Sequence, residues 1–271
     1  MNANLPAEAL VGREMELRRL LDAIRKRQSM LIWGPHDAGK TALLRAAVAE
    51  LSAEERSSCI CWPGPASRKQ LLSHFIGRLF ELGNPFVRTK AHADGANPAS
   101  LSRWLASQTS LRLRGILFTA AAPGEYRIFL DHFPPASHDA ARLIQELMQR
   151  CKTPVYLTGP GFSVKDIGFA WSLYWNDALR IHLGPLNLED ARSLFDICVK
   201  RLGLDAFDLA DFREEVLRWS GHLPGAIMRM CELAANARYR YRDRIKTKLV
   251  HVDYLMQARH SAGARTGSFV R

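Results

Sequence analysis

The residues best suited to chemistry form a short loop near the start of the chain. Residues 34–41 have the sequence GPHDAGKT and match the pattern G-x-x-x-x-G-K-[ST] in full. Glycines at both ends let such a loop wrap tightly, so that its backbone N–H groups point at a phosphate. The Lys40 ammonium can then contact the β- and γ-phosphates of a nucleotide, and the Thr41 hydroxyl can bind Mg²⁺. Asp37 is unusual, because an acid in an anion-binding loop weakens binding unless it points outward.

A second candidate group follows an apolar segment further along the chain. Residues 127–131 have the sequence RIFLD, an apolar strand pattern that ends in an acid. A carboxylate at the C-terminal edge of a parallel strand lies where ligands bind, so Asp131 is expected to hold Mg²⁺ or one of its waters. The alternative is an acid that caps the following turn. His132 comes next, and a neutral imidazole can accept a proton near pH 7.

Alternating strands and helices must position these groups. Apolar runs predict strands at 29–33, 59–62, 126–130, 155–158 and 179–183. Helical periodicity predicts helices at 17–24, 40–51, 68–82, 98–121 and 140–149, a surface loop at 84–97, and only helices after Pro185. Strands that alternate with helices indicate an α/β fold whose parallel sheet is covered on both faces. The phosphate loop then follows the first strand and opens the next helix, as its chemistry requires.

Composition excludes several classes of protein. The chain has 271 residues, of which 47% are apolar and 24% charged, as is typical of globular domains and unlike disordered or collagenous chains. No segment approaches the ~20 apolar residues that span a bilayer. The first residues lack a basic and an apolar region, so no secretory signal is expected. We therefore expect a cytoplasmic protein whose five cysteines are reduced.

The positive charge is concentrated near the C-terminus. Nine Lys or Arg and two acids between positions 236 and 271 give that stretch +7 of the net charge of +11. Two interpretations stay open: a solvated helix face with a soluble tail, or a surface that neutralises a nucleic-acid backbone. The candidate contact residues are Arg238, Arg240, Arg242, Arg244, Lys246 and Lys248.

Three further motifs resemble a known group of ATPases. Residues 11–14 (VGRE) resemble the box that opens the ATPase domains of the AAA+ and STAND groups, including the origin-recognition type. Residues 186–191 (LNLEDA) resemble the entry into their helical lid, and residues 220–227 (SGHLPGAI) resemble the lid motif G-G-L-P-x-A-L. The resemblance covers about residues 10–235.

The resemblance implies a fold and a nucleotide site. The expected fold is a five-stranded parallel P-loop NTPase core of the ASCE type, with helices on both faces, in residues 1–183. An all-α lid would occupy 184–258, and 259–271 would form a flexible basic tail. Val11 would lie near the adenine, Pro224 would approach the base, and Mg-ATP would bind between core and lid. The residues expected to bind the nucleotide are Val11, Gly12, Arg13, Gly34, Pro35, His36, Asp37, Ala38, Gly39, Lys40, Thr41, Ala42 and Pro224.

Departures from the family pattern bear on catalysis. Relatives often place Glu or Asp where this chain has His132, and that acid activates the attacking water. Either His132 replaces it, or Glu125 or Asp139 does, or hydrolysis is slow or absent. Thr158 would be the polar sensor near the γ-phosphate, or an ordinary strand-end hydroxyl. Arg229 could substitute for the Arg that origin-type relatives carry where this chain has Pro224, and no arginine finger is evident.

Three functions follow as hypotheses. The first is an AAA+/STAND-type switch ATPase that binds Mg-ATP and hydrolyses it slowly, or with a partner's stimulation, to ADP and phosphate. The second is a non-hydrolysing, nucleotide-dependent module that holds DNA, another nucleic acid or a protein effector through its basic C-terminal region. The third, a small-molecule kinase, is disfavoured by the lid motifs and by the position of Asp131. Relatives of both groups often self-associate, STAND proteins on ATP binding, but without an evident arginine finger the resemblance alone does not imply it for this chain.

Overall fold

The computed structural model describes residues 10–62, 67–121, 125–133, 138–161 and 164–266, without the side chains of 164 and 258–266. The chain divides into two compact units, and each is considered by itself. The first unit contains Met15–Pro35 and Lys40–Leu183. Among the described residues, the second contains 184–266 together with 10–14 and His36–Gly39. Four residues of the phosphate loop therefore group with the second unit.

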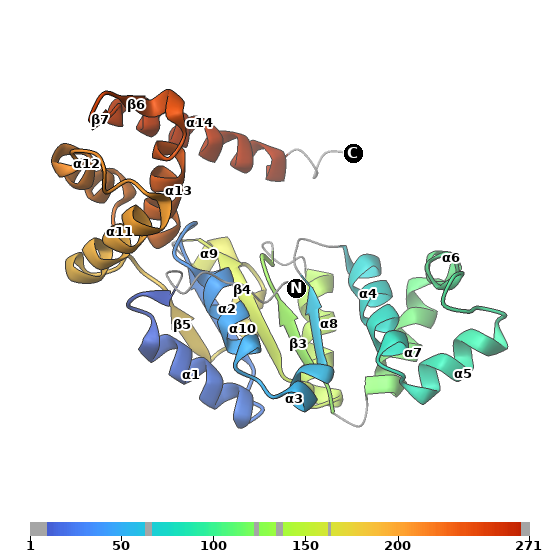
Figure 1. Cartoon of the computed structure of the whole chain (residues 1–271). Helices are drawn as coiled ribbons and strands as arrows, with labels where there is room; N and C mark the ends of the chain where they lie inside the picture. Colours follow the sequence, from blue (N-terminus) through green and yellow to red (C-terminus); the bar gives the residue numbers. More distant parts are fainter. Residues whose placement is uncertain (1–9, 63–66, 122–124, 134–137, 162–163, 267–271) are drawn as a thin grey trace. The chain divides into compact units, whose positions relative to one another are not determined.

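A five-stranded parallel sheet forms the centre of the first unit (Figure 1). In spatial order its strands are β2 (Cys59–Trp62), β3 (Arg127–Leu130), β4 (Val155–Pro160), β1 (Met30–Gly34) and β5 (Arg180–His182). The strands are short apolar runs, as expected of a parallel sheet whose two faces are covered. This confirms the predicted α/β P-loop NTPase fold.

Helices alternate with these strands. The helices of the first unit are α1 (Glu14–Arg25), α2 (Lys40–Ala49), α3 (Ala53–Ser57), α4 (Arg68–Glu81), α5 (Pro85–Ala93), α6 (Leu101–Ser107), α7 (Ser110–Ala121), α8 (His138–Arg150), α9 (Val164–Ile167) and α10 (Ala170–Leu173). A 3₁₀ turn, Asp177–Leu179, precedes β5. Helices α4 to α7 lie between β2 and β3 in the chain and pack on one another and on α8 (Figure 1).

Two predictions for the α4–α7 segment were wrong. The surface loop predicted at 84–97 contains helix α5, whose first turn is capped by the Asn84 side chain on the Val87 N–H, with Pro85 at its first position. The single helix predicted at 98–121 is two helices, α6 and α7, separated at Gln108. Polar composition concealed α5, because only Val87 and Ala91 of its residues are buried.

The second unit is mainly helical and has its own hydrophobic core. Its elements are α11 (Leu188–Leu202), α12 (Ala210–Ser220), α13 (Pro224–Ala234), a 3₁₀ turn (Ala237–Tyr239), β6 (Arg240–Tyr241), β7 (Arg244–Ile245) and α14 (Thr247–Thr266). Asn187 caps the start of α11, while Gly203 and Gly221 end α11 and α12 in the left-handed conformation.

The prediction of helices only after Pro185 missed the β6–β7 hairpin. Its strands have two residues each and are joined by a tight turn in which Arg242 has a φ of 54°. The tail predicted at 259–271 is helical as far as Thr266, because α14 continues that far, and 267–271 lie outside the described residues.

Candidate nucleotide site

The phosphate loop begins where β1 ends and closes where α2 begins. Gly34 has a φ of 150° and Gly39 a φ of 93°, both in the region that favours glycine. A Cβ at Gly34 would lie 2.2 Å from the Leu183 carbonyl oxygen, so only glycine fits there. The Lys40 ammonium donates to the carbonyl oxygens of Gly34 at 2.8 Å and Pro35 at 2.6 Å. The lysine therefore holds the loop closed around the place where a phosphate would bind.

Replacing Gly34 by alanine should destabilise the first unit. The added Cβ would overlap the Leu183 carbonyl and occupy a strained φ, so we expect the free energy of unfolding to fall by about 2 kcal/mol or more. Gly115→Ala is the matched control, because nothing lies within 4 Å of the new Cβ and alanine favours a helix. Chemical denaturation of both variants checks the prediction, and equal stabilities would contradict it.

Four polar residues meet beside the start of α2. The Thr41 hydroxyl donates to Asp131 Oδ1 at 3.0 Å and lies 3.1 Å from His132 Nε2. Thr158, on the neighbouring strand β4, donates to the same carboxylate oxygen at 2.8 Å. The His132 backbone N–H donates both to Asp131 Oδ1 and to the Thr158 hydroxyl. Parallel strands β3 and β4 thus bring together residues that lie far apart in the sequence.

The donors of this group fit Mg²⁺. Asp131 is 1% exposed, and its second oxygen, Oδ2, is buried with no hydrogen-bond partner in the described part of the chain, although His132 Nε2 lies 3.7 Å from it. A buried carboxylate oxygen that accepts no hydrogen bond is costly unless a cation or water completes its contacts. Carboxylate and hydroxyl oxygens are the ligands that Mg²⁺ prefers, so Asp131 and Thr41 would hold the ion directly or through water. His132 lies at the edge of this group, its side chain 41% exposed.

The family-like motifs gather within the second unit. Gly12 has a φ of 67°, and a Cβ there would lie 2.3 Å from the Asp190 carboxylate. The first motif (residues 11–14) therefore packs on the second (residues 186–191). Arg13 is buried and donates to the carbonyl oxygens of Ala38 and Gly184. The Leu186 N–H donates to the His222 carbonyl, which joins the second motif to the third.

Two more of the expected residues are part of this unit's interior. Val11 packs on its hydrophobic core, and Pro224 is buried at the first position of α13. Their roles toward the adenine stay predictions. Arg13 has a contact that sequence reasoning did not anticipate, because it binds the backbone of the phosphate loop at Ala38.

Asp37 is bonded to the helices of the second unit. Its carboxylate forms an ion pair with Arg229 of α13 and accepts a hydrogen bond of 3.3 Å from the Tyr254 hydroxyl of α14. The Gly225 N–H donates to the Asp37 carbonyl at 2.9 Å, and His36 Nδ1 lies 2.9 Å from the carboxylate. Arg229 therefore contacts the phosphate loop, and its partner in the loop is the Asp37 carboxylate. Sequence spacing holds no signal for this pair.

The basic residues after position 236 are used in two ways. Arg238 pairs with Asp253, Arg240 donates to the Ala235 carbonyl at 2.6 Å, and Lys246 donates to the Arg238 carbonyl. These contacts tie the end of α13 to the hairpin and α14. Arg242, Arg244 and Lys248 are exposed, and Arg244 lies 3.9 Å from the Asp208 carboxylate.

The hairpin places an aromatic side chain among the exposed cations. Tyr241 is 58% exposed, and the Arg242 guanidinium lies 5.4 Å from its ring centre. Arg244 is in the strand opposite Tyr241. A contact of any of these residues with nucleic acid stays a prediction.

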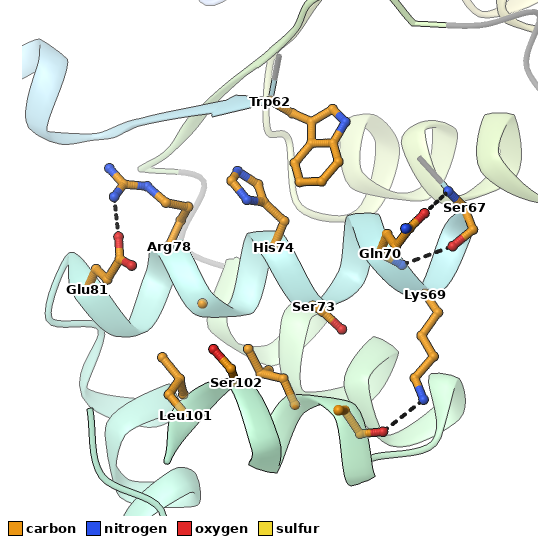
Figure 2. A pocket seen from close by; sticks show the side chains of 13 residues that line it. Trp62, Ser67, Lys69, Gln70, Ser73, His74, Arg78, Glu81, Leu101 and Ser102 are labelled. Carbon is orange, nitrogen blue, oxygen red and sulfur yellow. Dashed lines mark hydrogen bonds and ion pairs between the residues drawn. The ribbon is translucent and has the colours of Figure 1, made fainter. Parts of the chain in front are cut away.

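A cavity of about 760 Å³ lies elsewhere in the first unit, between α4 and α6 (Figure 2). Its charged side chains are already bonded to neighbours, since Lys69 donates to the Ala106 carbonyl and Arg78 pairs with Glu81. Trp62 and His74 make an edge-to-face contact at its rim. No residue expected to bind the nucleotide is among the described residues that line it.

Thiol chemistry and a membrane span find no support in the described residues. All five cysteines are free, and burial raises the pKa of Cys59 to about 12 and also raises that of Cys61 and Cys151. Thiols with raised pKa values are poor nucleophiles near pH 7. None of the helices in the part of the chain that is described is long and apolar enough to cross a bilayer.

A solved ATPase structure has a fold similar to that of this chain. The Walker-type ATPase PABY2304 of Pyrococcus abyssi matches with a TM-score of 0.58 and 15% identity, over 99% of this chain and 79% of that one. The Pif1 helicase from Candida albicans matches more weakly, with a TM-score of 0.36 and 14% identity over 80% of this chain and 48% of that one. A search of curated proteins found no match.

The family follows from a sequence comparison. The loop, the acid at the end of β3 and the five-stranded sheet are the parts that an ATPase of this fold requires. The family model described as "AAA ATPase domain" matches residues 9–158, which is more than half of the chain. The chain therefore belongs to the AAA ATPase domain family.

Proposed function

We propose that this protein is a switch ATPase that binds Mg-ATP at residues 34–41 and hydrolyses it slowly to ADP and phosphate. The observation that supports this most directly is the cluster of Thr41, Asp131 and His132 at the start of α2, in which the buried Asp131 Oδ2 accepts no hydrogen bond. Bound Mg²⁺ would neutralise charge on the β- and γ-phosphates. Lys40 would move from the loop carbonyls to the phosphates, and Thr41 and Asp131 would hold the ion.

Slow turnover is proposed because the cluster has an imidazole where a carboxylate is expected. A general base must lie within hydrogen-bond distance of the attacking water, directly or through one more water. His132 Nε2 is 3.1 Å from the Thr41 hydroxyl and thus close to the proposed ion. The positive charge of the ion would oppose protonation of the ring and so make it a weaker base. Thr158, fully buried and bonded to Asp131, fixes the carboxylate in this proposal.

The test is ATP binding and steady-state phosphate release by the purified chain, with and without Mg²⁺. We expect ATP to bind more tightly with Mg²⁺ and phosphate to appear slowly. Failure to bind either ATP or ADP would overturn the proposal. Binding without any phosphate release would remove the hydrolytic part and leave a nucleotide-binding switch.

The hairpin supports a second candidate function, the holding of single-stranded nucleic acid. The exposed Tyr241 offers a ring on which a base can stack, and Arg242 and Arg244 beside it can neutralise phosphates. Arg238 and Arg240 contribute less in this proposal, because they bond more closely within the unit than Arg244, whose partner Asp208 is 3.9 Å away. A protein effector is the alternative partner for the same surface.

Changing Arg242 and Arg244 together to alanine should weaken binding of single-stranded DNA. Each lost phosphate contact should reduce the slope of log affinity against log salt by about 0.7. Arg192→Ala with Lys200→Ala is the matched control, since both residues are exposed and basic but lie on α11. Fluorescence anisotropy across a salt series provides the measurement. Binding that is absent, or equal in the two double variants, would end this candidate function.

A further inference from the structure

The phosphate loop carries a negative charge that a helix of the second unit neutralises. Asp37 lies between Gly34 and Lys40 in the sequence. It therefore belongs to the same short loop as the backbone N–H groups that would receive a phosphate. Like charges this close repel, and the repulsion is strongest where protein excludes water. The Asp37 side chain is 12% exposed, which leaves little solvent to screen it. An unpaired Asp37 would therefore reduce the affinity of the loop for nucleotide.

The ion pair between Asp37 and Arg229 counters that charge. The guanidinium also lies 3.3 Å from His36 Nδ1 and 5.6 Å from the centre of the Tyr254 ring, which confines it beside the carboxylate. The Tyr254 hydroxyl donates to the same carboxylate at 3.3 Å. Arg229 of α13 thus neutralises the Asp37 carboxylate, and Tyr254 of α14 adds a hydrogen bond to it.

Backbone geometry holds the pair in place. Asp37 has a φ of 67°, a conformation uncommon for residues other than glycine. A Cβ at Gly225 would lie 2.9 Å from Asp37 Oδ1 and 3.1 Å from its Cα, so the loop approaches α13 as closely as a glycine allows. The hydrogen bond from the Gly225 N–H to the Asp37 carbonyl fixes this approach.

We propose that Asp37 is an electrostatic brake on nucleotide binding and that Arg229 sets its strength. Arg229 is a positioning residue here: it acts on the nucleotide through Asp37. An event that draws α13 away from residues 36–39 exposes the acid and lowers nucleotide affinity. By linkage, bound nucleotide favours the arrangement in which the pair is formed. This inference rests on the proposed binding of ATP at the loop.

A double-mutant cycle tests the brake, with dissociation constants of Mg-ATP measured by isothermal titration calorimetry. We expect Asp37→Asn to tighten binding about 3- to 10-fold and Arg229→Ala to weaken it by a similar factor, as for a partly buried charge pair. In the Asp37→Asn background, Arg229→Ala should weaken binding less than it does in the wild type. Arg229→Lys, which keeps the charge, should restore most of the wild-type affinity.

The cycle separates the brake from its alternatives. If Arg229→Ala weakens binding equally with Asp or Asn at position 37, the guanidinium acts on the phosphates directly and the brake is wrong. An unchanged affinity for Asp37→Asn also overturns it. Arg213→Ala, which breaks an exposed pair with Asp196, is the matched control and should leave affinity unchanged. If the wild type binds no Mg-ATP, the proposed function itself fails. Thermal unfolding of each variant checks that folding is intact.

Discussion

Replacing Lys40 by alanine should reduce ATP affinity about 10- to 100-fold and bring phosphate release to background, because hydrogen bonds to a charged group contribute about 1.5–3 kcal/mol. The ammonium now bonds to the Gly34 and Pro35 carbonyls, and in the proposed complex it moves to the β- and γ-phosphates. Its charge is also needed as negative charge builds on the transferred group, so the rate should fall further than the affinity.

A second lysine controls for the loss of a surface charge. Lys69 likewise donates to a backbone carbonyl in the first unit, but it lies beside the α4–α6 cavity. Lys69→Ala should leave ATP affinity and phosphate release unchanged. Calorimetry and a phosphate-release assay on both variants, with equal melting temperatures as a check on folding, provide the comparison. Wild-type affinity in Lys40→Ala would show that nucleotide does not bind at this loop.

The parts of the site that follow one another in sequence could be predicted from it. Residues 34–41 combine a strand end, a glycine turn and a helix start, and each of these leaves a local pattern. Asp131 follows a buried strand, and parallel strands always present their C-terminal ends at one edge of a sheet. Local patterns and one topological rule were therefore enough to predict that Thr41 and Asp131 lie at the same site.

The rest depends on contacts that no local pattern records. The Asp37–Arg229 pair joins residues at opposite ends of the chain, and only packing of α13 and α14 brings them together. The β6–β7 strands are too short for a period of two to be visible. Helix α5 is different, because Asn84 followed by Pro85 is a helix-start signal that its polar composition outweighed.

Replacing His132 by glutamate should raise phosphate release about 10- to 100-fold, within the range attributed to general-base catalysis. The residue directly follows Asp131, the acid proposed to bind Mg²⁺, and has a φ of 52°, held by hydrogen bonds from its N–H to Asp131 and Thr158. Those bonds use the backbone and survive substitution, so a glutamate would occupy the same place. A carboxylate beside the proposed Mg²⁺ becomes neutral when it takes a proton from water, whereas an imidazole would become a second cation next to the ion.

Two further variants at this position decide what the native imidazole does. His132→Gln keeps a polar group without a basic site, and His132→Ala removes the group. If the natural protein is a weakened ATPase, both should release phosphate within about threefold of the wild type, while the glutamate variant exceeds all of them. ATP affinity should stay within about twofold in each case, because the His132 side chain contacts the Thr41 hydroxyl and the Asp131 carboxylate rather than the loop N–H groups.

The opposite pattern would assign catalysis to the histidine. Loss of turnover in both His132→Ala and His132→Gln, without gain in His132→Glu, would mean that the imidazole is the base. Its rate would then follow the fraction of neutral imidazole and rise with pH until the ring is deprotonated. The weakened-ATPase proposal predicts no such limb, because the native ring does not take the proton. A pH profile of phosphate release for the wild type and His132→Gln therefore separates the two mechanisms even where the single-point rates are close.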